Sequence, residues 1–255
     1  MNGDLDTAAR CLIDARHAIA LTGAGLSVES GIPAFRGPGG LWTKHGEPPM
    51  NGYERFLADP RKAWEDRLNP TGPMRELWEA LGRAEPNPGH RALVELEDLN
   101  VVRATITQNV DNLHRLAGSR HVLAIHGNAT LIRCIQCVAR FERGEIDYAI
   151  LPPRCPRCDG LLKSDTVSFG EPIPPDVMDA CGDEAARADC MIVIGTSATV
   201  YPAAGLPIAI ADRGGDLIEV NPYPSELTAM CRVTLSGPAG EILPALVDRV
   251  RQLAR

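Results

Sequence analysis

Residues 23–37 read GAGLSVESGIPAFRG and follow directly on a short apolar run at residues 18–21. A run of this length is typical of a buried strand, and a glycine-rich turn after a strand can bring backbone N–H groups close to the phosphates of a nucleotide. The stretch only partly fits a GxGxxG fingerprint, because Gly23 and Gly25 occupy the first two glycine positions but Val28 occupies the third. It therefore predicts a nucleotide-binding turn that departs from the dinucleotide fingerprint.

The composition limits the class of protein. The chain has 255 residues, of which 44% are hydrophobic, enough to bury one large core or two lobes. It contains no run of about 18 apolar residues and no basic segment followed by an apolar one at its start, so we expect a soluble, cytoplasmic protein without a membrane span. The formal net charge of −7 argues against direct, sequence-independent binding to nucleic acid.

Apolar runs alternate with helical patterns along the chain. Strands are expected at residues 18–21, 101–106, 122–125, 191–194, 217–220 and 233–235. Apolar residues at helical spacing precede the first two strands, and residues 242–253 give a closing helix. Strands separated by helices predict an α/β fold with a Rossmann-like parallel sheet and helices on both faces.

Two stretches interrupt this alternation. Residues 35–86 are polar and rich in Gly and Pro, and residues 133–163 carry two CxxC pairs. We expect both to build a second, smaller lobe within one domain of residues 1–255. The predicted large lobe comprises residues 1–34, 87–132 and 164–255, and the small lobe comprises a helical insertion (35–86) and a zinc ribbon (133–163).

The cysteine spacing is that of a zinc site. Seventeen residues separate the two CxxC pairs, a pattern in which each CxxC turn presents two thiolates to one tetrahedral ion. Two redox dithiols or four incidental cysteines are the alternatives. Four thiolates close the coordination shell, so the sequence predicts one structural Zn²⁺ ion bound by Cys134, Cys137, Cys155 and Cys158.

A zinc ribbon is also compatible with a binding module that has no catalytic activity. In residues 133–163 the only aromatic residues are Phe141 and Tyr148, too few for a convincing base-stacking platform. The residues that could carry chemistry lie elsewhere in the chain. The binding module is therefore the lesser alternative.

Polar blocks follow the predicted strands at their carboxyl ends, where α/β sheets place ligands. TQNVDNLH at residues 107–114 follows the second strand, His126-Gly127 follows the third, and Gly195-Thr196-Ser197 follows the fourth. From the residues alone, the first block is a polar turn that opens a helix. The imidazole of His126 suits acid–base work, because its ordinary pKa of about 6.5 lets it accept and return a proton near neutral pH.

Taken together, the ordered blocks resemble the sirtuins, the NAD-dependent protein deacylases. They include VSFGE at residues 167–171, Asn221 and the turn at residues 237–240, and they extend from Gly23 to Gly240. The resemblance implies an NAD-dependent protein-lysine deacylase that acts on acyl-lysine peptides or proteins, consumes NAD as a cosubstrate and releases nicotinamide and O-acyl-ADP-ribose. Protein mono-ADP-ribosylation or NAD hydrolysis at the same site is the alternative. The loop features argue against a hydride-transferring dehydrogenase.

The resemblance also implies catalytic roles. His126 is expected to act as a general base on a ribose hydroxyl, while Asn109 and Asp111 are expected to hold the nicotinamide carboxamide. Phe35 is expected to shield the reactive carbon from water, and Arg36 to steady phosphate or ribose. His114 is expected to be structural.

The same resemblance implies two sets of contacts. The expected NAD contacts are Gly23, Ala24, Gly25, Ser27, Ile32, Pro33, Phe35, Arg36, Trp42, Gln108, Asn109, Asp111, His126, Gly195, Thr196, Ser197, Asn221 and Ala239. The expected substrate contacts are Val167, Phe169, Gly170 and Glu171, in a segment that resembles the sirtuin strand that pairs with the acyl-lysine peptide.

Two positions of the sequence, 67 and 70, bear on which acyl group is preferred. The desuccinylating branch of the family carries a Tyr and an Arg three residues apart in the small lobe, and this chain has Arg67 and Pro70 there. The sequence therefore predicts neutral acyl groups, acetyl first.

Overall fold

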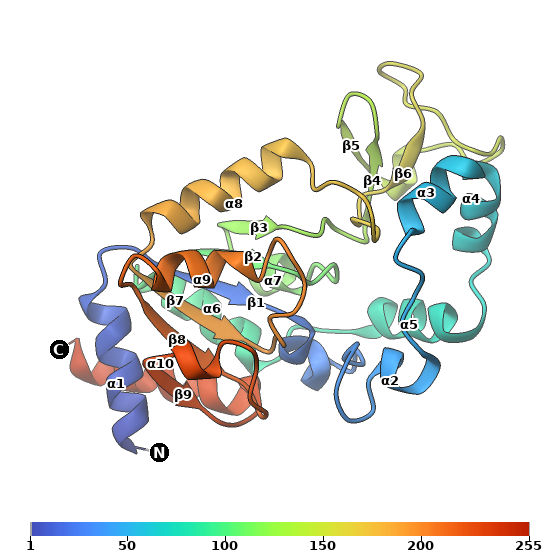
Figure 1. Cartoon of the computed structure of the whole chain (residues 1–255). Coiled ribbons are helices and arrows are strands. Elements are labelled where there is room, and N and C mark those ends of the chain that lie inside the picture. The colour runs from blue at the N-terminus through green and yellow to red at the C-terminus, as the bar shows by residue number, and fades with distance from the viewer. Residues whose placement is uncertain (1, 255) are drawn as a thin grey trace.

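The computed structural model describes residues 2–254 and contains a six-stranded sheet and a separate three-stranded sheet (Figure 1). The large sheet has the order β3-β2-β1-β7-β8-β9, and every neighbouring pair in it is parallel. Its strands are β1 (Ala18–Thr22), β2 (Val102–Thr107), β3 (Val122–Ala124), β7 (Cys190–Ile194), β8 (Asp216–Val220) and β9 (Val233–Leu235). The predicted parallel α/β sheet is confirmed, and each strand bound lies within one residue of its expected place.

Helices cover both faces of the large sheet. Along β1, Ala18 and Ala20 face one apolar core, whereas Ile19 and Leu21 face another. This alternation arises because successive side chains of a strand point to opposite faces, and here both faces are buried. The first core is completed by α1 (Asn2–Asp14), α6 (Pro88–Asp98) and α10 (Ala239–Leu253), and the second by α8 (Pro175–Arg187) and α9 (Gly205–Ala211).

The three-stranded sheet has its own apolar core. Its antiparallel order is β5-β4-β6, with β4 (Leu131–Cys134), β5 (Arg140–Glu142) and β6 (Leu162–Ser164). Phe56 and Trp64 cluster with Ile132 and Leu162 of this sheet, and the Trp64 indole donates to the Leu162 carbonyl at 2.8 Å. Phe56 belongs to α3 (Gly52–Ala58) and Trp64 to α4 (Pro60–Leu68), and the same segment after β1 also contains α2 (Leu41–His45) and α5 (Gly72–Arg83).

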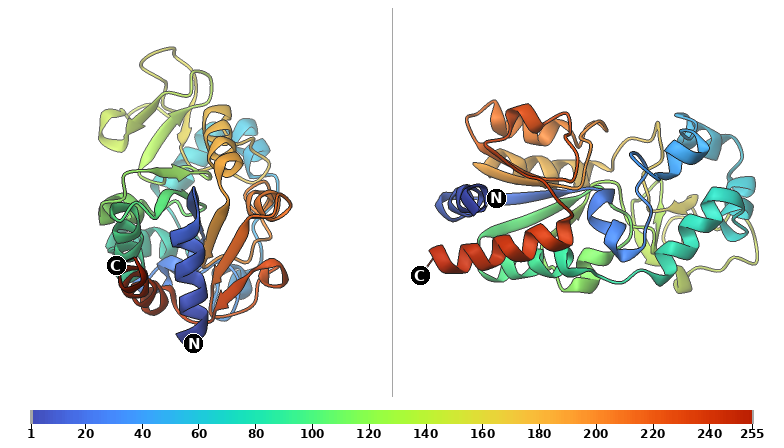
Figure 2. Two further views of the ribbon diagram at one scale, coloured as in Figure 1. Left: turned by 90° about the vertical axis from the view of Figure 1, so that its left-hand side faces the viewer. Right: turned by 90° about the horizontal axis from the view of Figure 1, so that it is seen from below.

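The right-hand view of Figure 2 places α3, α4 and α5 at the end of the molecule opposite α1. The remaining short elements are α7 (Leu113–Ala117) and the 3-10 helices η1 (Ala24–Ser30), η2 (Arg143–Glu145) and η3 (Thr228–Met230). Within residues 2–254, no helix has the length and apolar character needed to cross a membrane.

The topology gathers five loops at one edge of the large sheet. Because the strands are parallel, the segments that follow β1, β2, β3, β7 and β8 all leave from its carboxyl edge. The segment after β1 contains α2 to α5, and the segment after β3 contains the three-stranded sheet. A site at this edge can therefore draw on both insertions.

Candidate active site

A cavity of about 930 Å³ lies at this carboxyl edge. Most of the predicted NAD and substrate contacts line it, and they come from the loops after β1, β2, β3, β7 and β8 and from the segment before α8. The lining includes Gly23, Ala24, Gly25, Phe35, Arg36, Trp42, Gln108, Asn109, His126, Val167, Phe169, Gly170, Glu171, Gly195, Thr196, Ser197 and Asn221.

The glycine turn passes very close to the loop after β7. Gly23 N–H donates to the Ile194 carbonyl at 2.9 Å, and Gly25 N–H donates to the Gly195 carbonyl at 2.8 Å. A Cβ atom at Gly25 would lie 2.7 Å from the Cα of Gly195, so only glycine allows this crossing. Val28, at the third fingerprint position, is 47% exposed in η1 and lines the cavity, so no close packing requires a glycine there.

Ser27, Asn109 and Asp111 form a hydrogen-bonded group behind the cavity wall. The Asn109 Nδ2 group donates to the Gly23 carbonyl at 3.0 Å and to Ser27 Oγ at 3.1 Å. Ser27 in turn donates to Asp111 Oδ2 at 2.6 Å, and the Leu113 N–H donates to Asp111 Oδ1 at 2.9 Å. Burial raises the pKa of Asp111 above its usual value, against the lowering effect of these hydrogen bonds.

His126 presents one ring nitrogen to the protein backbone. Its Nδ1 lies 3.2 Å from the carbonyl oxygen of Gln108, which can only accept, so Nδ1 carries the proton in the neutral ring. Nε2 then keeps its lone pair. Burial lowers the pKa of His126 below its ordinary value, partly offset by the Gln108 hydrogen bond. The neutral ring is thus set up to accept a proton at Nε2.

An aromatic wall and an arginine close one side of the cavity. The ring centroids of Phe35 and Trp42 are 4.9 Å apart, and those of Trp42 and Phe169 are 5.6 Å apart. The Arg36 guanidinium lies 4.5 Å from the Trp42 ring centroid and pairs with Glu47 at 3.0 Å. Arg36 therefore packs on the wall and pairs with Glu47, an acidic neighbour that no sequence motif marks.

Residues 167–171 form no strand in the structure. The Val167 N–H donates to the His126 carbonyl at 2.8 Å, and the Glu171 N–H turns back to the Ser168 carbonyl at 3.0 Å. A strand needs a partner, and none of residues 2–254 pairs with this segment along its length. The Glu171 side chain is only 2% exposed and is engaged by cationic side chains, so Glu171 contributes to the cavity wall without a free carboxylate.

Five predicted NAD contacts do not line the cavity. Ser27 and Asp111 lie behind Asn109, as described above. Ile32 is buried and donates its N–H to the Ser27 carbonyl at 3.3 Å, and Ala239 is buried at the start of α10. Pro33 lies next to Ile32, within the loop that leads to the aromatic wall.

Several lining residues were not predicted. Glu29 lines the cavity from within the 23–37 stretch, although it was not among the expected contacts, and Met178, Tyr201 and Tyr223 line it from outside the expected blocks. Tyr201 and Tyr223 are 68% and 60% exposed. Large exposed rings beside a cavity can mark a binding surface, and this exposure is visible only in the structure.

His114 lies outside the cavity lining. Thr22 Oγ1 donates its hydrogen to Thr107 Oγ1, so the same hydroxyl must accept the hydrogen bond from His114 Nε2 at 2.9 Å. His114 Nε2 therefore carries the ring proton, and His114 Nδ1 is an acceptor. His90 Nδ1 accepts from the Asn87 N–H, which leaves His90 Nε2 as a donor. Both remaining atoms lack a hydrogen-bond partner among the described residues, and the two buried rings meet edge-on with centroids 5.1 Å apart.

The four paired cysteines fit a zinc ion. Their Sγ atoms all lie within 4.8 Å of one another, with Cys134 and Cys158 at 3.5 Å and Cys137 and Cys155 at 3.7 Å. A tetrahedral ion with Zn–S bonds of about 2.3 Å requires Sγ atoms about 3.8 Å apart. The Gln136 and Arg157 N–H groups point to Sγ atoms of Cys134 and Cys155. The geometry and the all-thiolate donor set match a structural site with a closed shell.

Comparison with known proteins adds independent information. Residues 23–202 match the model of the Sir2 family. The chain is 45% identical to the NAD-dependent protein deacylase of Thermococcus kodakarensis over 255 residues, which cover 98% of this chain and 96% of that protein.

Two solved structures are similar along their length. A mutant Sir2 homologue in complex with ADP-ribose aligns with a TM-score of 0.83 and 41% identity over 97% of both chains. A Sir2 complex with a p53 peptide and NAD⁺ aligns with a TM-score of 0.77 and 30% identity over 95% of this chain and 96% of that one. The range matched by the family model contains the cavity-lining loops after β1, β2, β3 and β7.

Proposed function

The chain belongs to the Sir2 family, and we propose that it is an enzyme that removes acyl groups, acetyl first, from lysine side chains of proteins while consuming NAD. Its products are free lysine, nicotinamide and O-acyl-ADP-ribose. The observation that carries this proposal is that a single cavity contains the His126 ring, the glycine turn and residues 167–170.

The cavity residues fit NAD. The volume of about 930 Å³ lies at the upper end of the range of about 300–1,000 Å³ for ligand pockets. The loops at Gly25 and Gly195 approach so closely that side chains are excluded there, which leaves backbone groups to meet a ligand. When bound, NAD supplies a nicotinamide–ribose bond whose cleavage leaves an electrophilic carbon for the acyl oxygen.

Three groups act at the nicotinamide end. His126 Nε2 takes the proton from a ribose hydroxyl, since Nδ1 is held by Gln108. Both Asn109 Nδ2 hydrogens are used by Gly23 and Ser27, so Asn109 Oδ1 is oriented to accept from a carboxamide N–H. Asp111 acts through Ser27 and fixes that orientation.

The aromatic wall excludes water from the reacting carbon. Phe35 stacks against Trp42, which continues to Phe169, so the wall reaches from the glycine-stretch loop to the substrate segment. Water excluded in this way cannot hydrolyse NAD before the acyl group attacks.

Polar groups on the opposite loops hold the phosphates and ribose. Gln108 donates to Thr196 Oγ1 at 2.9 Å and Asn221 donates to the Thr196 carbonyl at 3.0 Å, which fixes the Gly195-Thr196-Ser197 turn. Arg36 binds a phosphate by giving up its ion pair with Glu47, because that pair is exposed and therefore weak. Pro238, which directly precedes the buried Ala239 at the start of α10, lines the cavity at the proposed adenosine end.

The acyl-lysine peptide pairs with residues 167–170. The Val167 carbonyl and the Phe169 N–H have no hydrogen-bond partner within residues 2–254. Both belong to a segment that lines the cavity, so they are available to an extended chain that adds itself as a strand.

The predicted lobes and location are part of the same proposal. The separate apolar cluster of Phe56, Trp64, Ile132 and Leu162 supports a small lobe of residues 35–86 and 133–163, with zinc holding its ribbon. A cytoplasmic location is supported by the cysteines, which are all free thiols in the described chain.

The deciding experiment follows three products together. Purified protein is incubated with NAD and an acetyl-lysine peptide, and deacetylated peptide, nicotinamide and acetyl-ADP-ribose are measured in one reaction, with His126→Ala as the matched control. Equal amounts of all three from the wild type, and none from the variant, support deacylation. Nicotinamide without deacetylated peptide would instead indicate ADP-ribosyl transfer or NAD hydrolysis. A succinyl-lysine peptide run in parallel tests the expected preference for neutral acyl groups.

A further inference from the structure

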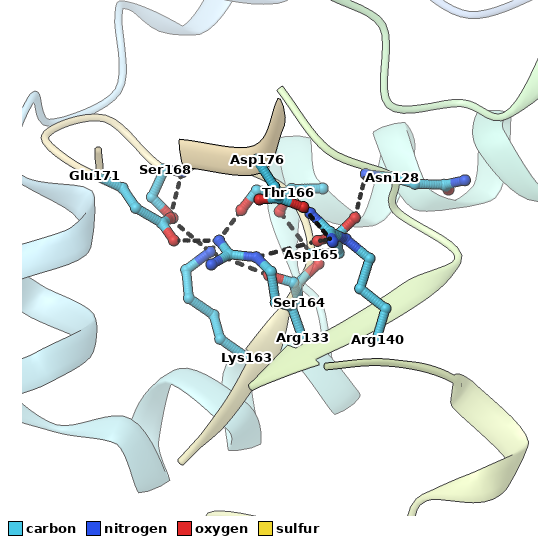
Figure 3. A network of polar contacts seen from close by, with 10 residues as sticks. All are labelled: Asn128, Arg133, Arg140, Lys163, Ser164, Asp165, Thr166, Ser168, Glu171 and Asp176. Carbon is cyan, nitrogen blue, oxygen red and sulfur yellow. Dashed lines mark hydrogen bonds and ion pairs between the residues drawn. The ribbon is translucent and has the colours of Figure 1, made fainter. Parts of the chain in front are cut away.

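Four charged side chains are buried together between the three-stranded sheet and the substrate segment (Figure 3). They are Arg133, Lys163, Asp165 and Glu171, here called the buried ion cluster, and their side chains are only 2–6% exposed. Removing such charges from water is costly, so their retention here calls for a reason other than stability.

Arg133 bridges the two carboxylates of the cluster. Its Nε donates to Asp165 Oδ1 at 3.1 Å, and its Nη2 donates to Glu171 Oε1 at 2.5 Å. Arg140 adds a second donor to Asp165 Oδ1 at 3.1 Å, and Lys163 Nζ lies 2.8 Å from Glu171 Oε2. Each negative charge is thus met by two positive groups.

Each carboxylate also accepts one backbone N–H from a loop beside the cavity. Glu171 Oε2 accepts from Ser168 at 2.8 Å, and Asp165 Oδ2 accepts from Asn128 at 3.2 Å. Asn128 lies two residues after His126, and the Val167 N–H donates to the His126 carbonyl at 2.8 Å. The cluster therefore ties the base-bearing loop and the substrate segment to the same guanidinium.

The substrate segment is fixed from the other side as well. The Tyr53 N–H donates to the Phe169 carbonyl at 3.0 Å, so α3 holds one end of the segment while Glu171 holds Ser168. These contacts fix the orientation of the two unpaired groups, the Val167 carbonyl and the Phe169 N–H. A segment ordered in advance binds an extended peptide with a smaller loss of conformational entropy.

We propose that Arg133 and Glu171 are positioning residues for the acyl-lysine peptide: Arg133 holds the Glu171 carboxylate, and Glu171 holds the Ser168 backbone, so that residues 167–170 can pair with substrate. This inference rests on the proposed deacylation and deepens it. Arg133 does not line the cavity, and the Glu171 carboxylate is already engaged by Arg133 and Lys163. The role therefore predicts an effect on peptide affinity and little effect on NAD affinity.

The test compares Glu171→Gln with Glu54→Gln, a substitution of an exposed glutamate on α3. Glu171→Gln keeps the side-chain shape but removes the charge that Arg133 and Lys163 face. Steady-state rates are measured with varied acetyl-lysine peptide at saturating NAD, and with varied NAD at saturating peptide. We expect the peptide KM to rise about tenfold, in keeping with the loss of one charge-assisted hydrogen bond, while the NAD KM changes less than about twofold. Glu54→Gln leaves both unchanged.

Arg133→Met and Arg133→Lys provide a second pair. Arg133→Met removes both bridges, whereas Lys retains the charge and restores one of them, so we expect the peptide KM to recover in part. Zinc content and circular dichroism of each variant show whether the fold is intact. If Arg133→Met does not fold, the isosteric Glu171→Gln still decides the question.

Binding of a fluorescein-labelled acetyl-lysine peptide, followed by anisotropy, separates the two levels of the proposal. A wild type that deacetylates peptide while Glu171→Gln shows the same peptide KM and the same anisotropy titration overturns the positioning role alone. A wild type that binds labelled peptide without deacetylating it contradicts the proposed function, and the variant's weaker binding would still support positioning. A wild type that does not bind the peptide overturns both.

Discussion

Ser27 donates its hydroxyl hydrogen to Asp111 across 2.6 Å, and the same oxygen accepts from Asn109 at 3.1 Å. The direction of both bonds is set, because a carboxylate can only accept. Asn109 is thereby locked with its amide nitrogen toward Ser27 and its oxygen free. The buried carboxylate of Asp111 does not line the cavity, yet through Ser27 it determines that the Asn109 oxygen is the free atom of the amide.

Asp111→Asn should disturb this arrangement. The amide of the substituted side chain can turn its NH₂ group toward Ser27, which then has no acceptor for its hydroxyl hydrogen at position 111. Ser27 no longer has a fixed direction of hydrogen bonding, so Asn109 loses its fixed orientation. We expect kcat/KM for NAD to fall about ten- to hundredfold, the range for a lost hydrogen bond to a charged group. Nicotinamide release at varied NAD measures this, with the exposed Asp98→Asn as control. Wild-type kcat/KM in Asp111→Asn would exclude Asp111 from the nicotinamide end.

The pH dependence of deacylation should report on His126. A general base must be unprotonated, so the rate falls as pH falls through the His126 pKa. Burial places that pKa below the ordinary 6.5, and the neutral form therefore persists to lower pH. We expect kcat/KM to be level at neutral pH, with the midpoint of its acidic fall below 6.5. Rates in a series of buffers from about pH 5 to 8 test this, and a midpoint above about 7 would contradict it.

Cys155→Ser should release the zinc ion. Removing one of four thiolates opens a site whose binding energy is coupled to folding, so the three-stranded sheet loses its support. Trp64 packs on this sheet, and its fluorescence reports the change. We expect substoichiometric zinc, a lower melting temperature and a raised peptide KM, because Arg133 directly precedes the ligand Cys134. Cys231→Ser, outside the cluster, is the control and keeps its zinc.

The buried pair His90 and His114 should make folding acid-sensitive. Burial lowers their pKa values to about 4 and about 3, while both rings titrate near 6.5 when unfolded. Between these values the unfolded chain binds protons that the folded chain does not, so stability is lost as pH falls below about 6.5, by up to about 1.4 kcal/mol per pH unit for each ring.

Urea unfolding at about pH 7 and about pH 5 measures this loss. His114→Gln removes one titrating ring and should flatten the dependence. The exposed His121→Gln should keep the wild-type dependence. Equal slopes in all three proteins would contradict the assignment.

Gly127→Ala should damage the loop that carries His126. Gly127 has a φ of +78°, and an added Cβ would lie 1.9 Å from the Asp165 carbonyl oxygen, which belongs to the backbone and cannot swing away. We expect a loss of more than about 3 kcal/mol of stability or loss of activity with a displaced His126. Gly144→Ala, where no atom lies within 4 Å of the new carbon, should behave as wild type in thermal melts and turnover.

Local patterns were sufficient to predict the sheet and the metal site. Apolar runs bounded by Gly and polar turns locate the six parallel strands, and the two CxxC turns carry their ligands within a few residues of each other. The partners of Glu171 could not be predicted in this way, because Arg133 and Lys163 come from β4 and β6 and meet it only after folding. Glu47, which pairs with Arg36, and the lining residue Met178 likewise belong to no motif.

The 167–171 segment shows a different limit. The sequence resembles a strand, yet residues 2–254 supply no strand to pair with it, so the structure shows a turn closed by Glu171. In the proposed function, the strand that pairs with this segment belongs to a different molecule, the acyl-lysine peptide. The sequence of residues 167–171 indicates that the segment can pair as a strand, and the structure shows the segment unpaired within residues 2–254.

The contact of Phe56 and Trp64 with Ile132 and Leu162 has an evolutionary consequence. One pair lies in the insertion after β1 and the other in the insertion after β3, so two segments far apart in the sequence share one apolar core. They must be inherited as a matched set. A chimaera that exchanges either insertion alone would leave Trp64 or Leu162 without its matched apolar partners, whereas exchange of both insertions would keep this core intact.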